Sequence, residues 1–354
     1  MSRFFSEKLA ALEPYVPGEQ PQDQKYVKLN TNESPYPPSQ KARAAAAAAA
    51  ERMHLYPDPD CAALKKKLCE VYGLSEENVL FGNGSDEILN FAFLAFCDET
   101  HGAAFPNVTY GFYPVFAAVN RVPYTEFPLR EDFTVNVEDY IGVAKTVFLA
   151  NPNAPTGIAL PPAEIARIAR SNPDSVVVVD EAYVDFGAES CLPLIGELDN
   201  LLVVQTFSKS RSMAGARLGF CAGNAALIAD LNTVRCSTNP YNVNALTMAA
   251  GIGVLEDEAY TRENCRAICR TRSDTAEALR ALGFTVTPSQ TNFLFARHER
   301  IGGETLYRKL KARGVLVRHF NKPEISRYNR ITIGTREQME ILLAAIRTIM
   351  EEEK

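Results

Sequence analysis

Lys209 is the side chain whose neighbours in the sequence most clearly suggest chemistry. It lies in the segment Thr206-Phe-Ser-Lys-Ser-Arg-Ser-Met-Ala-Gly-Ala-Arg217, between two serines and ahead of an arginine. A lysine amine can form a Schiff base with an aldehyde cofactor such as pyridoxal phosphate. Thr206, Ser208 and Arg217 would then bind the cofactor's phosphate through hydroxyl groups and a guanidinium group. The alternative is a solvated loop rich in serine, lysine and arginine.

Asp180 is the second candidate for chemistry. It follows the valine run in Val176-Val-Val-Val-Asp-Glu-Ala-Tyr183, and such a run predicts a buried strand. A carboxylate at the end of that strand could face the pyridine nitrogen of the cofactor, keep the ring protonated and make it an electron sink. Tyr183 could hydrogen-bond the phenolic oxygen of the ring. Alternatively, Asp180 caps the turn after the strand.

A glycine turn upstream could bind an anion. The segment Gly82-Asn-Gly-Ser-Asp-Glu87 follows a predicted strand at 78–81 and precedes the apolar run 88–96, which is typical of a helix. Glycine lets the backbone approach a phosphate, and the free amides at the start of a helix favour one, with Ser85 near the cap. An ordinary capped turn is the alternative.

The surrounding elements would position these groups. Strands and helices alternate from about residue 76 to 235, which predicts an α/β fold with a doubly wound, mainly parallel sheet. Leu201–Thr206 reads as a strand of this sheet, so Lys209 would emerge at its carboxyl end, where α/β folds place their chemistry. Further helices are predicted at 41–53, 243–282 with a break near 256–258, 304–313 and 336–352, and further strands at 145–150, 284–286, 292–296, 315–317 and 331–333. We expect an N-terminal arm (1–30) that joins the small domain, a large domain (31–256) and a small α/β C-terminal domain (257–354).

The motifs together resemble the fold-type I, pyridoxal-phosphate-dependent aminotransferases, and most closely the histidinol-phosphate aminotransferase family, over essentially the whole length. The matching segments are, in order, Leu29-Asn-Thr-Asn-Glu-Ser-Pro-Tyr36, Tyr56-Pro-Asp-Pro-Asp60, Gly82–Glu87, Asn151-Pro-Asn-Ala-Pro-Thr-Gly157, Asp180–Tyr183, Ser208-Lys209, Arg217 and Arg330-Ile-Thr-Ile-Gly-Thr-Arg336. Several ordered motifs at family-like spacing are far more specific than any one of them.

The resemblance implies a role for each matching residue. Lys209 would carry the cofactor, Asp180 would pair with the ring nitrogen and Tyr183 would contact the ring oxygen. Tyr110 would stack on the ring. Tyr56 would reach the cofactor phosphate of a neighbouring subunit, which implies a homodimer with shared active sites. The other cofactor-binding positions that the resemblance implies are Gly84, Ser85, Asp86, Thr206, Ser208 and Arg217.

One position departs from the family pattern. The family usually has an asparagine directly before Pro-Thr-Gly that hydrogen-bonds the ring oxygen, and Ala154 stands there in this sequence. Asn153 is the nearest residue that could replace it. Without a substitute, the electronic properties of the ring would shift.

Substrate recognition points to three residues. Arg318 follows the apolar run 315–317 and Arg330 opens Ile331-Thr-Ile333, so both are expected on short strands. Two converging guanidinium groups suit either a phosphate dianion or a carboxylate. Tyr15 matches a family tyrosine that contacts the substrate phosphate. Alternatively, Arg318 and Arg330 lie on a solvated strand face, and Tyr15 packs an N-terminal arm on the surface.

The resemblance implies transamination of histidinol phosphate with 2-oxoglutarate, which gives imidazole acetol phosphate and glutamate in histidine biosynthesis. Three other functions stay open. An aromatic or broad-range amino-acid transaminase would use Arg330 for a carboxylate, and a phosphothreonine-type decarboxylase would also hold a phosphate. A non-catalytic, cofactor-binding regulator would be expected to carry an added DNA-binding module, which is not evident here.

Composition excludes several classes. The net charge of −6 argues against a nucleic-acid surface. No apolar run is long enough to cross a membrane, and residues 1–10 lack the apolar centre of a signal peptide, so we expect a cytoplasmic protein. The eight scattered cysteines and four isolated histidines predict neither a disulfide nor a metal site.

Overall fold

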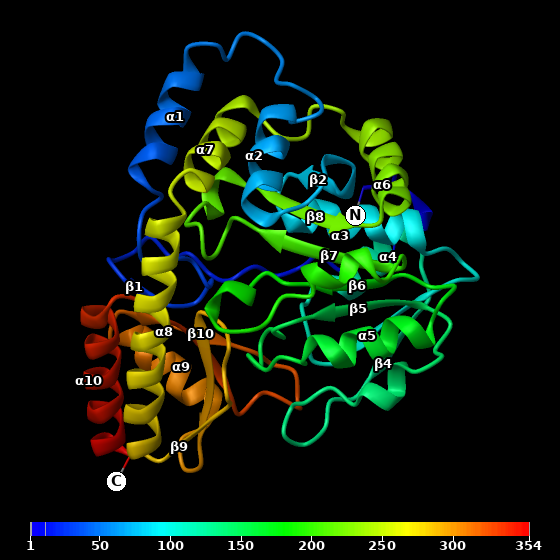
Figure 1. Cartoon of the computed structure of the whole chain (residues 1–354). Coiled ribbons are helices and arrows are strands. Elements are labelled where there is room, and N and C mark those ends of the chain that lie inside the picture. The colour runs from blue at the N-terminus through cyan, green and yellow to red at the C-terminus, as the bar shows by residue number, and fades with distance from the viewer. Residues whose placement is uncertain (1, 11, 354) are drawn as a thin grey trace.

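A seven-stranded sheet forms the centre of the molecule (Figure 1). The computed structural model describes residues 2–10 and 12–353; Met1, Ala11 and Lys354, which fall in the predicted arm and C-terminal domain, lie outside the described residues. In the strand order β2-β8-β7-β6-β5-β3-β4, only β8 runs antiparallel to its neighbours. The predicted doubly wound, mainly parallel sheet is therefore confirmed. Its strands are β2 (Val79–Gly82), β3 (Ala103–Pro106), β4 (Tyr124–Phe127), β5 (Thr146–Ala150), β6 (Val177–Asp180), β7 (Leu201–Thr206) and β8 (Gly219–Gly223).

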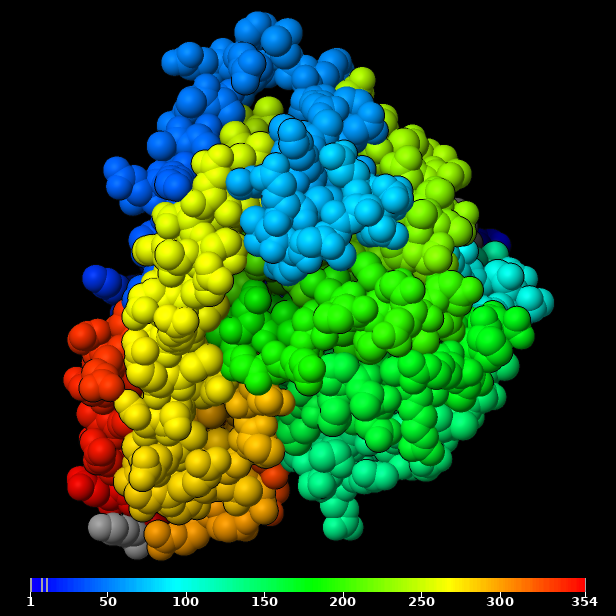
Figure 2. Space-filling model, viewed as in Figure 1, coloured from blue at the N-terminus to red at the C-terminus, as the bar shows by residue number. Residues whose placement is uncertain are grey.

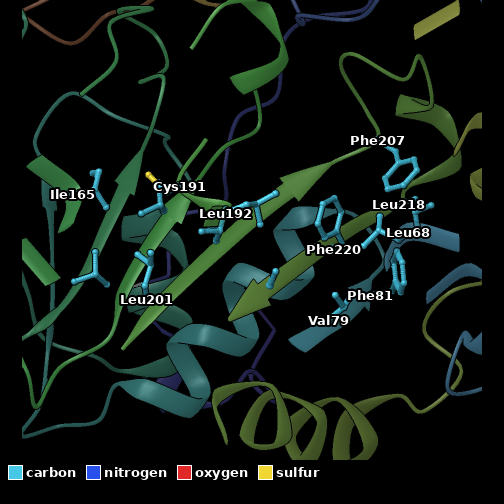
Figure 3. Packing of buried hydrophobic residues seen from close by; sticks show 14 of the residues in the cluster. Leu68, Val79, Phe81, Ile165, Cys191, Leu192, Leu201, Phe207, Leu218 and Phe220 are labelled. Atoms are coloured by element: carbon cyan, nitrogen blue, oxygen red, sulfur yellow. The ribbon is translucent and has the colours of Figure 1, made fainter. Parts of the chain in front are cut away.

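The central strands are buried along their whole length because both faces of the sheet are covered. In β7, Leu201 and Val203 belong to one hydrophobic cluster, whereas Leu202 and Val204 belong to the cluster on the other face. Figure 3 shows the first cluster, in which Leu201 lies on the same side of the sheet as Phe220 of β8. This two-sided burial explains the valine and leucine runs in the sequence.

Helices flank this sheet. They are α1 (Gln40–Ala50), α2 (Ala62–Tyr72), α3 (Ser85–Phe96), α4 (Tyr113–Asn120), α5 (Pro162–Ser171), α6 (Ala225–Thr238) and α7 (Ala245–Leu255). The alanine-rich helix α1 packs closely on α7. A Cβ atom added at Gly253 of α7 would lie only 2.8 Å from the backbone of Ala42, so a glycine is needed at this contact. Helix α1 ends at Ala50, three residues before the predicted end, and residues 51–54 form a turn toward α2.

The C-terminal part is built around the long helix α8 (Glu258–Ala281) and a small antiparallel sheet of order β12-β13-β10-β9. Helix α7 ends and α8 begins on either side of residues 256–257, where the sequence predicted a break. Helix α10 lies along α8 at the edge of the molecule (Figure 1). The remaining elements are β9 (Phe284–Val286), β10 (Phe293–His298), α9 (Gly303–Ala312), β11 (Val315–Leu316), β12 (Arg318–His319), β13 (Asn329–Thr332) and α10 (Arg336–Glu352).

The N-terminal arm is attached to the C-terminal part. Strand β1 (Val27–Lys28) pairs in parallel with β11, and Glu19 accepts hydrogen bonds from Tyr307 and Lys311 of α9. The division into three domains stays a prediction. Short 3₁₀ turns complete the fold at Glu7–Leu9, Glu76–Asn78, Val137–Tyr140, Val184–Phe186, Leu192–Gly196 and Ala214–Ala216. Within residues 2–10 and 12–353, no helix combines the length and the apolar character that a bilayer span requires.

Candidate active site

A cavity opens at the carboxyl ends of β5, β6 and β7. Ala150, Asp180 and Thr206, the last residues of these strands, line it. Parallel strands of an α/β sheet end at one edge, so side chains from distant parts of the sequence meet there. The cavity is lined by nine of the residues that the sequence predicted for the cofactor: Ser85, Asp86, Tyr110, Asp180, Tyr183, Thr206, Ser208, Lys209 and Arg217.

One end of the cavity suits a phosphate. Helix α3 begins there, directly after Gly84, whose φ of 80° lies in the left-handed region that favours glycine. A side chain at Gly84 would collide with the guanidinium group of Arg217. Nη2 of Arg217 donates to the Asp86 carboxylate at 2.7 Å. A phosphate here would meet the free amides of α3 and a guanidinium group that a carboxylate already orients.

Two hydroxyl groups border the same end. The Thr206 hydroxyl donates to Ser208 Oγ at 3.0 Å, and the backbone N–H of Ser208 donates to Thr206 Oγ1 at 3.1 Å. Both side chains are buried, so this local network holds the chain in one conformation as it leaves β7. Lys209 is the next residue, and its direction is set by this turn.

Asp180 also lines the cavity and is buried. Its carboxylate accepts hydrogen bonds from the Ala182 backbone N–H at 3.2 Å and from the Tyr113 hydroxyl at 3.3 Å. Burial raises the pKa of Asp180 to about 7, and the negative charge of Asp86 adds to the rise, while those two hydrogen bonds oppose it. A carboxylate in this position gains stability from a cationic partner.

Two tyrosines, Tyr110 and Tyr183, and the candidate lysine also line the cavity. The Tyr110 hydroxyl donates to Asp86 at 2.6 Å, and burial together with that carboxylate raises the pKa of Tyr110 well above its usual value. Nζ of Lys209 lies 5.8 Å from the ring centroid of Tyr183. The Tyr183 hydroxyl is the acceptor of a 2.9 Å hydrogen bond from the side-chain amide of Asn32.

The chemistry of these groups fits pyridoxal 5′-phosphate. Arg217, the hydroxyl groups and the start of α3 would hold the phosphate, and Asp180 would face the ring nitrogen. A buried carboxylate with a raised pKa suits a protonated pyridine nitrogen, because each charge compensates the other. Lys209 would bind the aldehyde carbon. Among the described residues, no three histidine, cysteine, aspartate or glutamate side chains gather as metal ligands would.

Two predicted cofactor residues lie elsewhere. The Asn153 side chain is buried: its amide donates to the Thr156 hydroxyl and to the Val108 carbonyl in the segment after β3, and its oxygen accepts from Thr109 of that segment. Ala154 lines the cavity in its place, so the structure does not bring Asn153 to the ring side. Tyr56 is 82% exposed and stacks on Tyr241, with ring centroids 4.6 Å apart, away from this chain's own cavity.

A second cavity adjoins the first and shares Tyr110, Tyr183 and Lys209 with it. The three predicted substrate residues, Tyr15, Arg318 and Arg330, all line it.

The two arginines converge in this second cavity. Arg318 and Arg330 are paired in the β12–β13 register, and their guanidinium carbons lie 5.6 and 5.7 Å from the ring centroid of Phe320. Arg330 donates to the Asn30 carbonyl at 3.1 Å, its buried Nε has no hydrogen-bond partner, and burial lowers its pKa. The cavity therefore presents a cation that lacks a counter-charge among the described residues.

The N-terminal arm forms one wall of this cavity. Arg318 donates to the carbonyl oxygens of Val16 and Pro17 at 3.0 and 3.2 Å. The Tyr15 ring stacks on Phe112 with a centroid distance of 4.2 Å. Arg318 thus orients the arm as well as facing the cavity.

Sequence reasoning missed three residues at these cavities. Tyr113 supports Asp180, and its spacing of three from Tyr110 at a helix start could have indicated a shared face. Lys322 lines the second cavity, where its Nζ donates to the Asn107 carbonyl at 2.6 Å. Asn32 lies within a motif that the sequence did single out, although its contact with Tyr183 could not be read from it.

The comparison with protein families now gives the class. Residues 24–346 match the family model for class I and II aminotransferases. The chain therefore belongs to this aminotransferase family, whose members depend on pyridoxal 5′-phosphate. The predicted enzyme class and cofactor are confirmed.

Individual relatives show where the chain belongs within the aminotransferase class. The histidinol-phosphate aminotransferase of Marinomonas sp. (strain MWYL1) is 50% identical over 353 residues, which cover 99% of this chain and 100% of that protein. That of Brachyspira hyodysenteriae (strain ATCC 49526 / WA1) is 45% identical over 355 residues, with the same coverage. Within the class, the chain belongs with the histidinol-phosphate aminotransferases.

A solved structure shares the fold. It is the crystal structure of histidinol-phosphate aminotransferase from Sinorhizobium meliloti in complex with pyridoxal-5′-phosphate, with a TM-score of 0.88, 23% identity and coverage of 99% of both chains. The predicted fold-type I architecture is confirmed.

Proposed function

We propose that this enzyme transfers the amino group of histidinol phosphate to 2-oxoglutarate, giving imidazole acetol phosphate and glutamate, as a step of histidine biosynthesis. The observation that carries the proposal is the convergence of Arg318 and Arg330 on a cavity that is continuous with the one around Lys209. Two guanidinium groups beside a reactive amine suit an amino donor that carries a phosphate. The identity with the Marinomonas and Brachyspira enzymes supports this choice.

The reaction needs a group that accepts electrons from the substrate carbon, and pyridoxal phosphate supplies this chemistry when bound. Lys209 would hold the cofactor and, once displaced by the donor amine, would move a proton from the substrate α-carbon through its free Nζ. Asp180 would keep a positive charge on the ring nitrogen as negative charge develops at the reacting carbon. Tyr110 would hold the ring in place by stacking on it.

The same arginines would serve the second substrate. Histidinol phosphate has no carboxylate, so its phosphate would occupy the place that an acidic group of 2-oxoglutarate takes in the second half of the reaction. Arg330 gains from either anion, because its buried charge has no counter-charge among the described residues. Substrate exchange between the two half-reactions would then follow ping-pong kinetics.

Single half-reactions test the proposal. The purified pyridoxal form is mixed separately with histidinol phosphate, phenylalanine and phosphothreonine, and the absorbance of the lysine-bound cofactor is followed. We expect the loss of absorbance to be about 10–100-fold faster with histidinol phosphate, since charge-assisted hydrogen bonds to its phosphate are worth this factor. A fast change with phenylalanine alone would move the function to an amino-acid transaminase, and carbon dioxide release from phosphothreonine would move it to a decarboxylase.

Arg330→Gln is the informative variant in the same measurement. It is expected to slow both half-reactions by about a hundredfold, because each substrate loses charge-assisted hydrogen bonds. Arg327→Gln is the matched control, since Arg327 is exposed and pairs with Glu299 at 3.1 Å. A variant that slowed only one half-reaction would contradict the shared anion site.

We also propose a homodimer in which Tyr56 completes the partner's cofactor site. Tyr56 lies on the connection between α1 and α2. This connection is part of the blue segment at the top edge of the molecule in Figure 2. Met53, Leu55 and Tyr241 nearby are also exposed, and together they leave an apolar surface that suits a second copy.

Two measurements test the dimer. Sedimentation equilibrium should give twice the chain mass of 39.0 kDa. Tyr56→Phe should weaken cofactor binding about tenfold, because a hydrogen bond to the phosphate is lost, and Tyr241→Phe should not. A monomer, or an equal loss in both variants, would contradict the shared site.

A cytoplasmic location is part of the same proposal. All eight cysteines are free, and five of them are buried, which suits a reducing compartment. The domain division at residues 30 and 256 is likewise proposed, and it is supported by the break between α7 and α8.

A further inference from the structure

Position 154 offers the cofactor cavity no hydrogen-bond donor. Ala154 lines the cavity without any polar side-chain atom, and the amide of the preceding Asn153 is occupied by Val108 and Thr156. Tyr183 also lines the cavity, and Nζ of Lys209 lies 5.8 Å from the centroid of its ring. The direction in which the Tyr183 hydroxyl points its proton therefore decides what the cavity offers to a ring oxygen.

Asn32 hydrogen-bonds the Tyr183 hydroxyl, and several neighbours hold Asn32 in place. It is 1% exposed and has a φ of 55°. Its backbone N–H donates to Thr332 Oγ1 at 3.0 Å, and its carbonyl oxygen accepts from Asn292 Nδ2 at 2.9 Å. The Thr332 hydroxyl donates in turn to Asn32 Oδ1 at 3.0 Å. Backbone and side-chain oxygen are thus both fixed by neighbours.

These contacts determine which end of the Asn32 amide faces Tyr183. With Oδ1 toward Thr332, the threonine proton has an acceptor. The flipped amide would direct Nδ2 and the backbone N–H at the same threonine oxygen and would remove that acceptor. Nδ2 therefore faces Tyr183, at 2.9 Å from its hydroxyl oxygen.

The polarity of this hydrogen bond has a consequence for Tyr183. An amide N–H can only donate, so the Tyr183 oxygen is the acceptor and its own proton must point elsewhere. The Tyr183 ring is fixed by an edge-to-face contact with Phe293, at 5.1 Å between centroids and 89° between planes. The proton is therefore free to point toward the cavity that Tyr183 lines.

We infer that Asn32 is a positioning residue that directs the phenolic proton of Tyr183 toward the cofactor's ring oxygen, so that the Tyr183 contact is kept where Ala154 offers none. The inference rests on the proposed cofactor roles of Tyr183 and Lys209.

Asn32→Asp tests this polarity with almost no change in shape. Asparagine and aspartate both tolerate a φ near 55°, but a carboxylate accepts a hydrogen bond and would draw the Tyr183 proton away from the cavity. Deprotonation of the lysine–cofactor linkage leaves more negative charge on the ring oxygen, so loss of a donor raises the pH of that transition. We expect a rise of about one pH unit or more in a spectroscopic titration.

Asn32→Gly separates this effect from the new charge. Glycine accepts the left-handed backbone and removes the amide without adding a carboxylate, so a smaller rise is expected. Adding Ala154→Asn to Asn32→Gly should return the transition close to the wild-type pH, because a donor is restored at position 154. The same substitution in the wild-type background should change little.

The outcomes are distinct. A transition that stays at the wild-type pH in both Asn32 variants, or a double variant that is not restored, would overturn the inference. Melting temperatures of the cofactor-free variants identify those that fold, and Asn32→Gly replaces Asn32→Asp if the buried carboxylate prevents folding. If wild-type protein gave no lysine-bound cofactor absorbance at all, the proposed function would fail instead.

Discussion

Lys209→Ala is expected to abolish transamination and the absorbance of the lysine-bound cofactor. The substitution removes both the amine that binds the cofactor and the base that moves the substrate proton. General acid–base catalysis alone contributes a factor of up to about 10⁴, so the rate should fall by at least this amount. Stopped-flow absorbance with histidinol phosphate and a coupled glutamate assay measure the two effects.

Two controls isolate this effect. Lys209→Arg keeps a positive charge and should be equally inactive, because a guanidinium group cannot act as the nucleophile. Lys66→Ala removes an exposed lysine of α2 and should retain full activity. A Lys209→Ala enzyme that still turned over at the wild-type rate would refute the assignment of the anchor.

Asp180→Asn is expected to lower the rate by about a thousandfold. The amide cannot hold a positive charge on the ring nitrogen, and removal of one preorganised electrostatic group at a reacting centre costs a factor of this size. The side chain keeps its shape, so the cofactor should still bind to Lys209. Glu181→Gln is the matched control, because Glu181 is buried next to Asp180 but bonds to Ser190 and Gln205. Equal losses in the two variants would argue against a specific role for Asp180.

The same substitution should stabilise the cofactor-free protein at neutral pH. The pKa of Asp180 is raised by burial to about 7 from an ordinary value of 3.8, so the folded chain retains a proton that the unfolded chain releases. Its contribution to the free energy of unfolding therefore falls as pH rises from about 4 to about 7, by about 4 kcal/mol in all.

Melting curves of the cofactor-free protein at pH 5 and pH 8 measure this contribution. Asp180→Asn should be less sensitive to pH than the wild type and should melt higher at pH 8. Cofactor addition should raise the melting temperature of the wild type more than that of the variant. Identical pH dependence in both proteins would contradict the raised pKa.

The sequence predicted the elements whose patterns are local. The buried strand β7 was predicted with the bounds that the structure has, because an uninterrupted apolar run between turns has few other interpretations. Helix α1 ends before its predicted end, since Glu51-Arg-Met53 also favour a helix and the stop is set by the chain's turn toward α2. Strands β11 and β12 belong to different sheets although one residue separates them, which depends on pairing partners distant in sequence.

The site residues show the same difference between what local sequence determines and what only the fold determines. Lys209, Asp180 and Arg217 were predicted because each lies in a motif whose chemistry is carried by a few adjacent residues. Asn153 was chosen because it precedes position 154 in the sequence. Neighbouring residues in a loop can point to opposite sides, however, and the Asn153 amide donates to Val108 and Thr156 instead. Asn32 meets Tyr183 across 151 positions of sequence, a contact that only the folded chain creates.

The tight contact between Gly253 and the backbone of Ala42 acts over a distance. It sets the spacing between α7 and α1, and α1 leads directly into the connection that carries Tyr56. In the proposed dimer, the spacing between α1 and α7 therefore determines how far Tyr56 extends into the other subunit's active site. A methyl group added at Gly253 would move α1 and, with it, Tyr56. A packing change in one subunit would therefore alter the catalytic properties of the other.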